Sequence, residues 1–190
     1  MIRTATCHLR SASPYSQSRS FDHDPGVEKP KRGESDLFDQ MHWRKKCHST
    51  ADGRIRIPQM SFKMAMDTAA KMEGTRVPGK GQATYTKYFL SGVLCADEIV
   101  LDQKVEDLEC DTLFVNADGV RGSGKRVWKR FPRIDSWEAV VNFIVLAPEI
   151  PNALFENTLV NAGRFVGIGR FRPQNGGYYG RFGVEEVTWS

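Results

Sequence analysis

The sequence predicts a single α+β domain in which helices cover one face of a β-sheet. Three stretches lead to this prediction. Residues 2–10 alternate between apolar and polar side chains, as a half-buried strand does. Residues 61–73 carry apolar side chains at helical spacing. Residues 138–146 are apolar at nearly every position, so this strand should lie at the centre of the sheet.

The remaining elements follow from turn signals and shorter patterns. Residues 11–32 are polar and contain three prolines, which predicts a long loop. Gly74 is a natural end for the helix over 61–73, and Pro151 suits the first turn of a helix that runs to about Ala162. Further helices are predicted at 36–46 and 85–93, further strands at 54–57, 93–101, 112–115 and 178–189, and a polar, basic loop at 118–133.

The order of these elements is strand, helix, strands, helix, strand. A ferredoxin-like, RRM-like βαββαβ sheet with its helices on one face accounts for this order. Two long insertions, at about 11–50 and 116–134, would project from that platform. No internal sequence repeat is apparent, so we expect one domain over residues 1–190.

Charge is unevenly distributed along the chain. The formal net charge is only +4, and the isoelectric point is about 8.9. Residues 119–134, however, contain six basic side chains and no acid, whereas residues 97–111 contain seven acids and one lysine. One face should therefore be positive and another negative. This permits a polyanionic partner and also head-to-tail contact between copies of the chain.

Membrane and secreted classes of protein are not indicated. No apolar run approaches the roughly 18 residues that a membrane-spanning helix needs, and residues 1–8 lack the apolar core of a signal peptide. The four cysteines lie at unpaired spacings, which is typical of free thiols in a reducing compartment. We therefore expect a cytoplasmic protein. The cysteines are Cys7, Cys47, Cys95 and Cys110.

Residues 163–183 form the most distinctive segment of the sequence. They contain seven glycines, four arginines, five aromatic residues and no acid. Glycine permits close backbone approach, arginine suits phosphate, and aromatic rings offer stacking faces to bases. In a strand–turn–strand element, alternation would send Phe165, Phe171 and Phe182 inward and the guanidinium groups outward. The composition indicates a nucleic-acid backbone as ligand, with a tight turn that only closes the sheet as the alternative.

Residues 119–125 fit the first seven positions of a phosphate-binding P-loop. The next residue is Arg126, where the motif needs Ser or Thr for magnesium, and Pro132 interrupts any following helix. Nucleotide hydrolysis is therefore not indicated. The basic loop combines charge with stacking surface, so we expect it to contact nucleic acid; a merely solvated loop is the alternative. Its candidate residues are Lys125, Arg126, Trp128, Lys129, Arg130 and Phe131.

No metal site and no cofactor are predicted. His42, Cys47 and His48 lie close in sequence, but no second pair at zinc-finger spacing accompanies them. Either histidine could be a general base for RNA cleavage by the 2′-hydroxyl, although nothing in the sequence places a catalytic partner beside it. A surface or partly packed histidine is the alternative. The carboxylates without paired spacing, which we expect to serve turns or caps, are Asp52, Asp67, Asp118 and Asp135.

Two short motifs resemble those of the RAMP superfamily, the RNA-binding proteins of CRISPR systems. Residues 57–65 (IPQMSFKMA) are similar to the family's entry into its first helix, although a glycine is missing where Gln59 or Met60 stands. Residues 167–180 (GIGRFRPQNGGYYG) resemble its C-terminal glycine-rich loop. The resemblance covers the whole chain in outline and is closest to the subunits that form the backbone of effector complexes. The chain is shorter than most of these and is also similar to compact, stand-alone bacteriophage proteins.

The resemblance implies a palm-like platform and roles for particular residues. Ser61 and Lys63 would contact phosphates at the start of the helix. The loop at 119–133 would form a thumb with Trp128 or Lys125 at a base step. The residues that would extend the groove after the first strand are Arg10, Tyr15 and Arg19. A second backbone contact would come from Gly167, Gly169, Arg170, Arg172, Gly176 and Gly177.

We therefore predict a protein without enzymatic activity that binds and coats single-stranded nucleic acid, RNA in the first place, as a homo-oligomer. Two alternatives stay open. One is a metal-independent RNA endonuclease of the same superfamily. The other is a protein-interaction role, in which the chain mimics a subunit of a CRISPR effector or takes part in phage assembly. Other CRISPR-type subunits would be further partners, and no membrane contact is expected.

Overall fold

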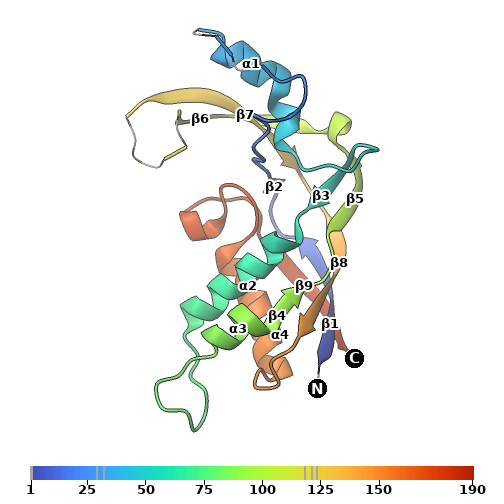
Figure 1. Ribbon diagram of the computed structural model, residues 1–190, viewed down its shortest axis with the longest axis vertical. Coiled ribbons are helices and arrows are strands. Elements are labelled where there is room, and N and C mark those ends of the chain that lie inside the picture. The colour runs from blue at the N-terminus through green and yellow to red at the C-terminus, as the bar shows by residue number, and fades with distance from the viewer. Residues whose placement is uncertain (1, 29, 32, 118, 121, 123) are drawn as a thin grey trace.

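A computed structural model describes residues 2–190, except residues 29, 32, 118, 121 and 123. The chain builds a four-stranded platform with helices on one face and an inserted layer of smaller sheets beyond it (Figure 1). Both termini lie at the end of the platform that is remote from the inserted layer.

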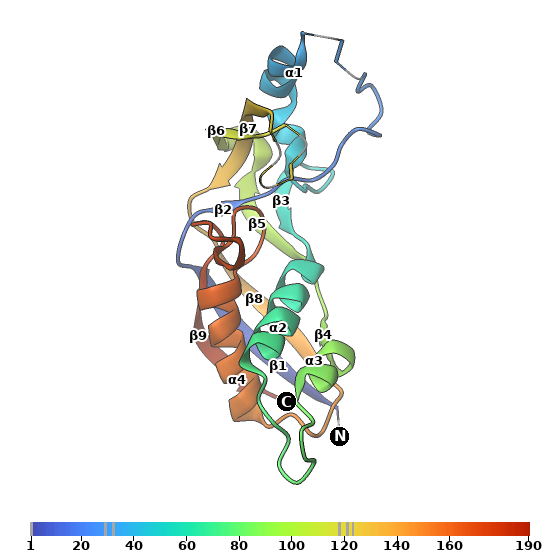
Figure 2. The same cartoon turned by 90° about the vertical axis from the view of Figure 1, so that its left-hand side faces the viewer.

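Two interlocked strand–helix–strand units form the platform. Its antiparallel strands are β1 (Arg3–Ser11), β4 (Val93–Cys95), β8 (Glu138–Val145) and β9 (Phe182–Trp189), in the order β4-β8-β1-β9. α2 (Gln59–Glu73) lies between β1 and β4 in the chain, and α4 (Asn152–Asn161) lies between β8 and β9. Both helices cover the same face (Figure 2). The predicted α+β, ferredoxin-like fold class is therefore confirmed.

The helix-covered face of the sheet carries the hydrophobic core. Ala5 and Cys7 of β1 are buried opposite Phe143 and Val141 of β8, and alternation along each strand repeats this pattern. The large side chains that the helices add are Phe62, Met66, Phe155 and Leu159. Each fully buried side chain of this size stabilises the fold by about 1.5–3 kcal/mol. As predicted, β8 is central, but Val140 on its other face is exposed because no helix covers that side.

The ends of the helices position the later segments. Gly74, at φ 57°, ends α2 by donating its N–H to the Ala70 carbonyl at 3.2 Å. α3 (Thr86–Gly92) packs beside α2. α4 continues into a π-helical turn over Ala162–Val166. A Cβ on Gly163 would lie 2.1 Å from the Phe182 carbonyl oxygen, so only glycine lets this turn contact β9 so closely.

The inserted layer comes from two insertions that pair with each other. The first follows β1 and contains β2 (Tyr15–Ser16), α1 (Ser35–His42), a 3₁₀ turn (Trp43–Lys46) and β3 (Arg54–Ile57). The second follows β4 and contains β5 (Ile99–Lys104), β6 (Glu109–Asn116) and β7 (Arg126–Ile134). β2, β7 and β6 form one sheet, and β3 pairs with β5 in another. Distant parts of the sequence thus meet beside the platform.

Two predicted elements are corrected by the structure. Residues 93–101 form two strands, because β4 completes the platform and β5 leaves it to pair with β3. The loop predicted over 118–133 is wrong from residue 126 onward, where β7 pairs with β6 in a hairpin. Many side chains of this hairpin are at least partly exposed, so its basic residues hide the strand pattern. Asp118, Arg121 and Ser123 lie outside the described residues.

The cysteines are free in the structure, as the spacing predicts. Burial raises the pKa of Cys7 and Cys47 to about 12 and that of Cys95 to about 11. These three thiols therefore stay protonated near neutral pH and are poor nucleophiles.

None of the helices in the described part of the chain is long and apolar enough to span a membrane.

Candidate functional site

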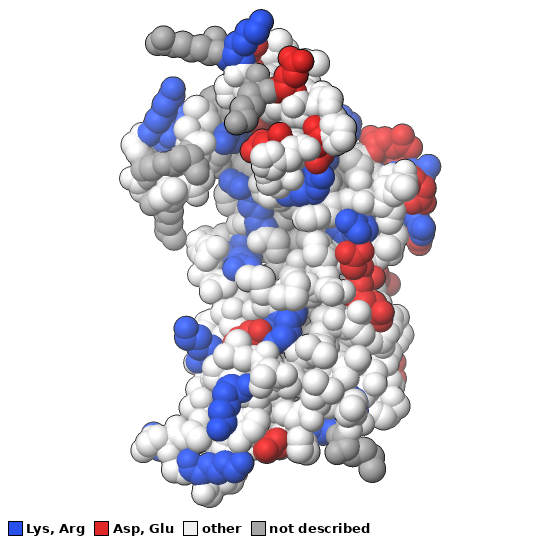
Figure 3. All heavy atoms as spheres, viewed as in Figure 1, with Lys and Arg blue, Asp and Glu red and all other residues white. Residues whose placement is uncertain are grey.

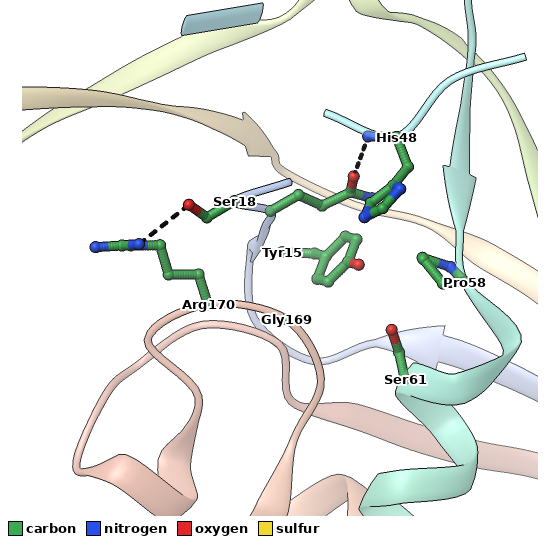
Figure 4. Close-up of a pocket in the computed structure, with 8 residues that line it drawn as sticks. Tyr15, Ser18, His48, Pro58, Ser61, Gly169 and Arg170 are labelled. Atoms are coloured by element: carbon green, nitrogen blue, oxygen red, sulfur yellow. Dashed lines mark hydrogen bonds between the residues drawn. The ribbon is translucent and has the colours of Figure 1, made fainter. Parts of the chain in front are cut away.

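A pocket of about 310 Å³ lies where the platform meets the inserted layer. Four segments contribute to it: β2 and the residues after it, the segment before β3, the start of α2, and the glycine-rich loop (Figure 4). The lining residues are Tyr15, Gln17, Ser18, His48, Pro58, Ser61, Gly169 and Arg170. We call this the junction pocket. Of the residues that the sequence singled out, it brings together Tyr15, His48, Ser61, Gly169 and Arg170.

The start of α2 gives the junction pocket a positive helix end. Pro58 precedes the helix, no side chain caps it, and its first turn contains no acid. The Ser61 N–H donates to the Pro58 carbonyl at 2.9 Å. The N–H groups of Gln59 and Met60 are therefore the ones that lack partners within the helix, and this helix end carries a partial positive charge. The Ser61 hydroxyl points into the pocket (Figure 4). Such a helix end is suited to a phosphate or another anion.

Arg170 is fixed beside the junction pocket by aromatic rings and one hydroxyl. Its guanidinium carbon lies 3.9 Å from the ring centroid of Phe131 and 4.6 Å from that of Phe171. Nη1 donates to Ser18 Oγ at 3.1 Å, and the backbone N–H donates to the Ser16 carbonyl at 2.8 Å. Burial lowers the pKa of Arg170 from its ordinary value, although the group stays charged. The side chain is thus held in one place and partly stripped of water.

Neither Arg170 nor Arg172 pairs with a carboxylate in the part of the chain that the structure describes, and the Nε of each is buried without a hydrogen-bond partner. Removing a charge from water without compensation is unfavourable. An anion that accepts from these groups would recover that free energy, so the two arginines indicate an anionic ligand.

The glycines of this loop have a reason within the chain itself. A Cβ on Gly169, at φ 73°, would lie 2.3 Å from a ring carbon of Tyr15 and 2.4 Å from the Ser16 oxygen. A Cβ on Gly167 would lie 2.6 Å from Pro173, and one on Gly177 would lie 1.7 Å from the Phe171 oxygen. Gly176, at φ 73°, ends the 3₁₀ turn at Pro173–Asn175. Close packing of the loop on itself and on β2 explains these glycines, and their contact with nucleic acid stays a prediction.

The predicted alternation of rings and guanidinium groups in this loop is wrong. Residues 167–181 lie between the π-helical turn and β9 and form no strand. The Phe165 side chain is 59% exposed, while Arg170 packs inward against Phe131. The loop is anchored instead by the Tyr179 hydroxyl, which donates to Asp111 of β6.

Lys63 does not reach the junction pocket, although Ser61 does. The Lys63 side chain is buried, and its ammonium group pairs with Asp67 and donates to the carbonyls of Phe89 at 3.0 Å and Leu90 at 3.1 Å. An ammonium group has three hydrogens, and all three have acceptors here. The phosphate contact implied for Lys63 is therefore wrong, because this lysine fastens the last turn of α3 to α2.

The three residues expected to extend the groove lie in three different places. Tyr15 is fully buried in the junction pocket, and burial raises the pKa of its hydroxyl. Arg10 pairs with Glu138 at 3.1 Å and Glu185 at 3.8 Å on the strands of the platform. Arg19 pairs with Asp24 at 2.6 Å and lines a different pocket. Of the three, only Tyr15 joins Arg170.

The β6–β7 hairpin distributes its candidate residues over two faces. The pairing from Glu109↔Arg133 to Asn116↔Arg126 has no bulge, so side chains alternate throughout. Trp128 and Arg126 therefore lie on the face opposite Lys129 and Phe131. Trp128 is 58% exposed and its ring lies 5.1 Å from that of Phe114, with the Arg126 guanidinium 4.6 Å from the Phe114 ring.

The remaining hairpin cations have mixed surroundings. Lys125 is exposed, and Lys129 donates to the Ala117 carbonyl at 2.9 Å. Arg130 pairs with Asp36 of α1 at 3.1 Å, so that its charge is partly compensated. Phe131 faces the glycine-rich loop, where Arg170 and Lys46 both approach its ring. The hairpin therefore offers a free aromatic face on one side and a support for Arg170 on the other.

His48 lines the junction pocket, whereas His42 stacks on Phe38 of α1 with ring centroids 4.4 Å apart. Burial lowers the pKa of His48, and the neighbouring Arg19 and Arg56 lower it further. His48 is therefore neutral near neutral pH. Among the described residues, no group of three or more His, Cys, Asp or Glu side chains could hold a metal ion.

The surface charge follows the uneven distribution along the sequence. In Figure 3, basic side chains gather between the β6–β7 hairpin and the glycine-rich loop, where the surface is hollowed. Acidic side chains lie mainly on the opposite side, around β5.

The sequence did not identify Gln17 or Ser18 as part of the site, because they lie in a polar stretch that carries no distinguishing pattern.

Comparisons with known proteins add a loose structural likeness. No protein-family model and no curated protein matches the sequence. Among solved structures, the chain is similar to a chain of a "CRISPR RNA-guided surveillance complex", with 11% sequence identity and a TM-score of 0.41. The similarity covers 98% of this chain and 68% of the other.

Proposed function

We propose that this protein binds single-stranded nucleic acid, RNA in the first place, through phosphate contacts between the β6–β7 hairpin and the glycine-rich loop. The observation that carries the proposal is Arg170, a positioned and partly desolvated guanidinium without a carboxylate partner among the described residues. The uncapped start of α2 lines the same pocket. Two independent anion-favouring groups thus meet in one pocket.

A single strand suits the site better than a regular duplex. The Trp128 ring is exposed on a protruding hairpin, and a base can stack on it only when its own face is free. Phosphate contacts supply affinity without sequence preference and depend strongly on salt. We therefore expect weak sequence discrimination and affinity that falls steeply with ionic strength.

Coating of the strand by many copies is the second part of the proposal. It is supported by the separation of basic and acidic surfaces, which allows one copy to approach the next head to tail. A RAMP-like role as a backbone subunit, of a host or phage system, would use the same arrangement. Light scattering of the protein with a 60-mer should give masses of several copies per strand. A single copy at saturation on both RNA and DNA 60-mers would contradict the coating model.

The test of binding is a charge reversal. Fluorescence anisotropy with labelled 20-mers should show that Arg170→Glu together with Arg172→Glu abolishes most of the affinity. The matched control is Arg76→Glu, an exposed residue in the loop after α2. Equal affinity of the double variant and the wild type would refute the site. No binding by the wild-type protein would instead favour the protein-interaction role.

One observation favours a second candidate function, RNA cleavage. His48, neutral near neutral pH, shares the junction pocket with the Tyr15 hydroxyl, so a base and a second polar group do meet there. A neutral histidine can remove the proton from a 2′-hydroxyl. Products ending in a 2′,3′-cyclic phosphate, absent with His48→Ala, would support this function. Intact RNA after long incubation with excess protein would dismiss it.

A further inference from the structure

A second pocket, of about 300 Å³, lies behind the junction pocket on the other side of residues 47–49. Its lining combines the end of the 3₁₀ turn after α1, the strand β3 and the loop after β2. We call it the rear pocket. The lining residues are Arg19, Asp24, Arg44, Lys45, Cys47, Ser49, Arg56 and Val105.

The backbone of residues 47–49 explains why the two pockets are separate. Cys47 is extended, with φ −88° and ψ 138°, and Ser49 forms an antiparallel bridge with Ile55. Successive side chains of an extended segment point to opposite sides, so His48 lines the junction pocket while Cys47 and Ser49 line the rear pocket. Buried Gln17 seals the gap by accepting from the His48 N–H at 2.6 Å and donating to the Arg56 carbonyl at 2.7 Å.

The rear pocket has an excess of positive charge. Four basic side chains and one carboxylate line it, a balance of +3, and Glu98, which pairs with Arg56 at 2.8 Å from outside the lining, reduces this to +2. Arg19 is already occupied by Asp24. Within the described residues, Arg44 and Lys45 form no ion pair with a carboxylate. Two cations are therefore available to a ligand.

Several of these groups are held in place before any ligand arrives. The Arg44 guanidinium lies 4.3 Å from the Trp43 ring centroid, which fixes its plane. Arg19 binds both oxygens of Asp24 and also donates to the Lys45 carbonyl at 3.2 Å. The Nε of Arg56 is buried without a partner among the described residues. An unsatisfied donor in a positive pocket indicates an anion with several acceptor oxygens.

We propose that the rear pocket is a second phosphate-binding site, in which Arg44, Lys45 and the Arg56 Nε donate to the oxygens of one phosphate group. Tetrahedral phosphate offers acceptors in several directions at once, as donors from the 3₁₀ turn and from β3 require. The phosphate can belong to the bound strand or to a separate small molecule such as a mononucleotide. The site shares no residue with the junction pocket. Binding of a strand phosphate there rests on the proposed function, whereas binding of a separate small molecule does not.

The test follows backbone amide resonances of the whole protein by NMR during titration with inorganic phosphate, with adenosine monophosphate and with a 20-mer RNA. We expect saturable shifts of the amides of residues 44–49, and at least tenfold weaker binding for Arg44→Glu with Lys45→Glu. The matched control is Lys71→Glu with Arg76→Glu, two exposed residues at and beyond the end of α2. Arg44 is exposed and Lys45 is partly exposed, and unchanged resonances elsewhere will show that the fold is kept.

The probes separate the two sources of phosphate. A response to inorganic phosphate or the mononucleotide at micromolar concentration assigns the site to a small ligand, whereas a response to the 20-mer alone assigns it to the strand. Absence of saturable shifts with all three probes, or equal shifts in the double variant, overturns the proposal. Failure of the proposed function looks different, because the 20-mer then fails to bind at all while the rear pocket still responds to phosphate.

Discussion

Arg170→Lys separates the charge of this residue from its geometry. Lysine keeps the positive charge but cannot place a planar group against Phe131 and Phe171 or keep the fork that reaches Ser18. A desolvated cation–ring contact contributes about 2 kcal/mol, and lysine recovers part of it. We therefore expect a loss of about 1–2 kcal/mol in binding free energy, or roughly 5–30-fold in affinity.

The assay is fluorescence anisotropy with a labelled 20-mer RNA at several potassium chloride concentrations. Each phosphate neutralised on a single strand contributes about −0.7 to the slope of log affinity against log salt. Arg170→Lys should keep the wild-type slope, while Arg170→Glu should make it shallower by roughly 0.7 or more. Wild-type affinity for the lysine variant would refute the role of the aromatic support. An unchanged slope for the glutamate variant would refute phosphate contact by Arg170.

Three further predictions concern stability. Lys63→Met leaves the partly buried Asp67 carboxylate without its partner, so it should lower the free energy of unfolding by about 3 kcal/mol in urea titrations. Nucleic-acid affinity should be unchanged. The control is Lys71→Met, at an exposed position of α2. Gly169→Ala should cost about 2–4 kcal/mol by thermal unfolding, because its Cβ would clash with Tyr15, whereas Gly79→Ala, also at φ 73° but with open space around it, should cost only about 1 kcal/mol. Since the pKa of His48 is lower in the folded protein than its unfolded value of about 6.5, the unfolded state binds the extra proton below that pH. The free energy of unfolding should thus fall between pH 7 and pH 5, and His48→Gln should reduce that fall; identical pH dependence of the two proteins would contradict the shift.

The platform could be predicted from the sequence because its signals are local. Residues 2–10 and 138–146 show their strand character without knowledge of their partners, and Gly74 marks the end of α2 by itself. The order of these elements then leaves few arrangements that bury the apolar faces. β2 could not be predicted in this way, because its two residues owe their strand geometry to pairing with Ile134 and Arg133 of β7. No local sequence pattern predicts a contact between residues so far apart in the chain.

The sequence identified several residues of the candidate site but not which of them lie together in the fold. Glycine, arginine and aromatic residues at 163–183 identified the loop, and the helix-entry motif identified Ser61. The place of His48 beside Gln17, and all of the rear pocket except Val105, depend on separate parts of the first insertion folding together, which a linear pattern does not encode. Lys63 shows the reverse failure. Its position in the motif indicated phosphate contact, but the carbonyl ends of α3 and the carboxylate of Asp67 bind its three hydrogens.

Whether an arginine can bind an anionic ligand depends on whether a carboxylate of the same chain already pairs with it. Arg10, Arg19 and Arg133 each pair with acids of the same chain, and a surface pair of this kind leaves little to offer a ligand. Arg170 instead replaces the carboxylate with two aromatic rings, which orient the guanidinium without cancelling its charge. The glycines serve that same end, since Gly169 lets the loop lie on Tyr15 and thereby sets the position of Arg170 beside it. The glycines of this loop therefore serve mainly to pack it tightly against the rest of the chain. Its capacity to bind an anion resides in the arginines that have no carboxylate partner among the described residues.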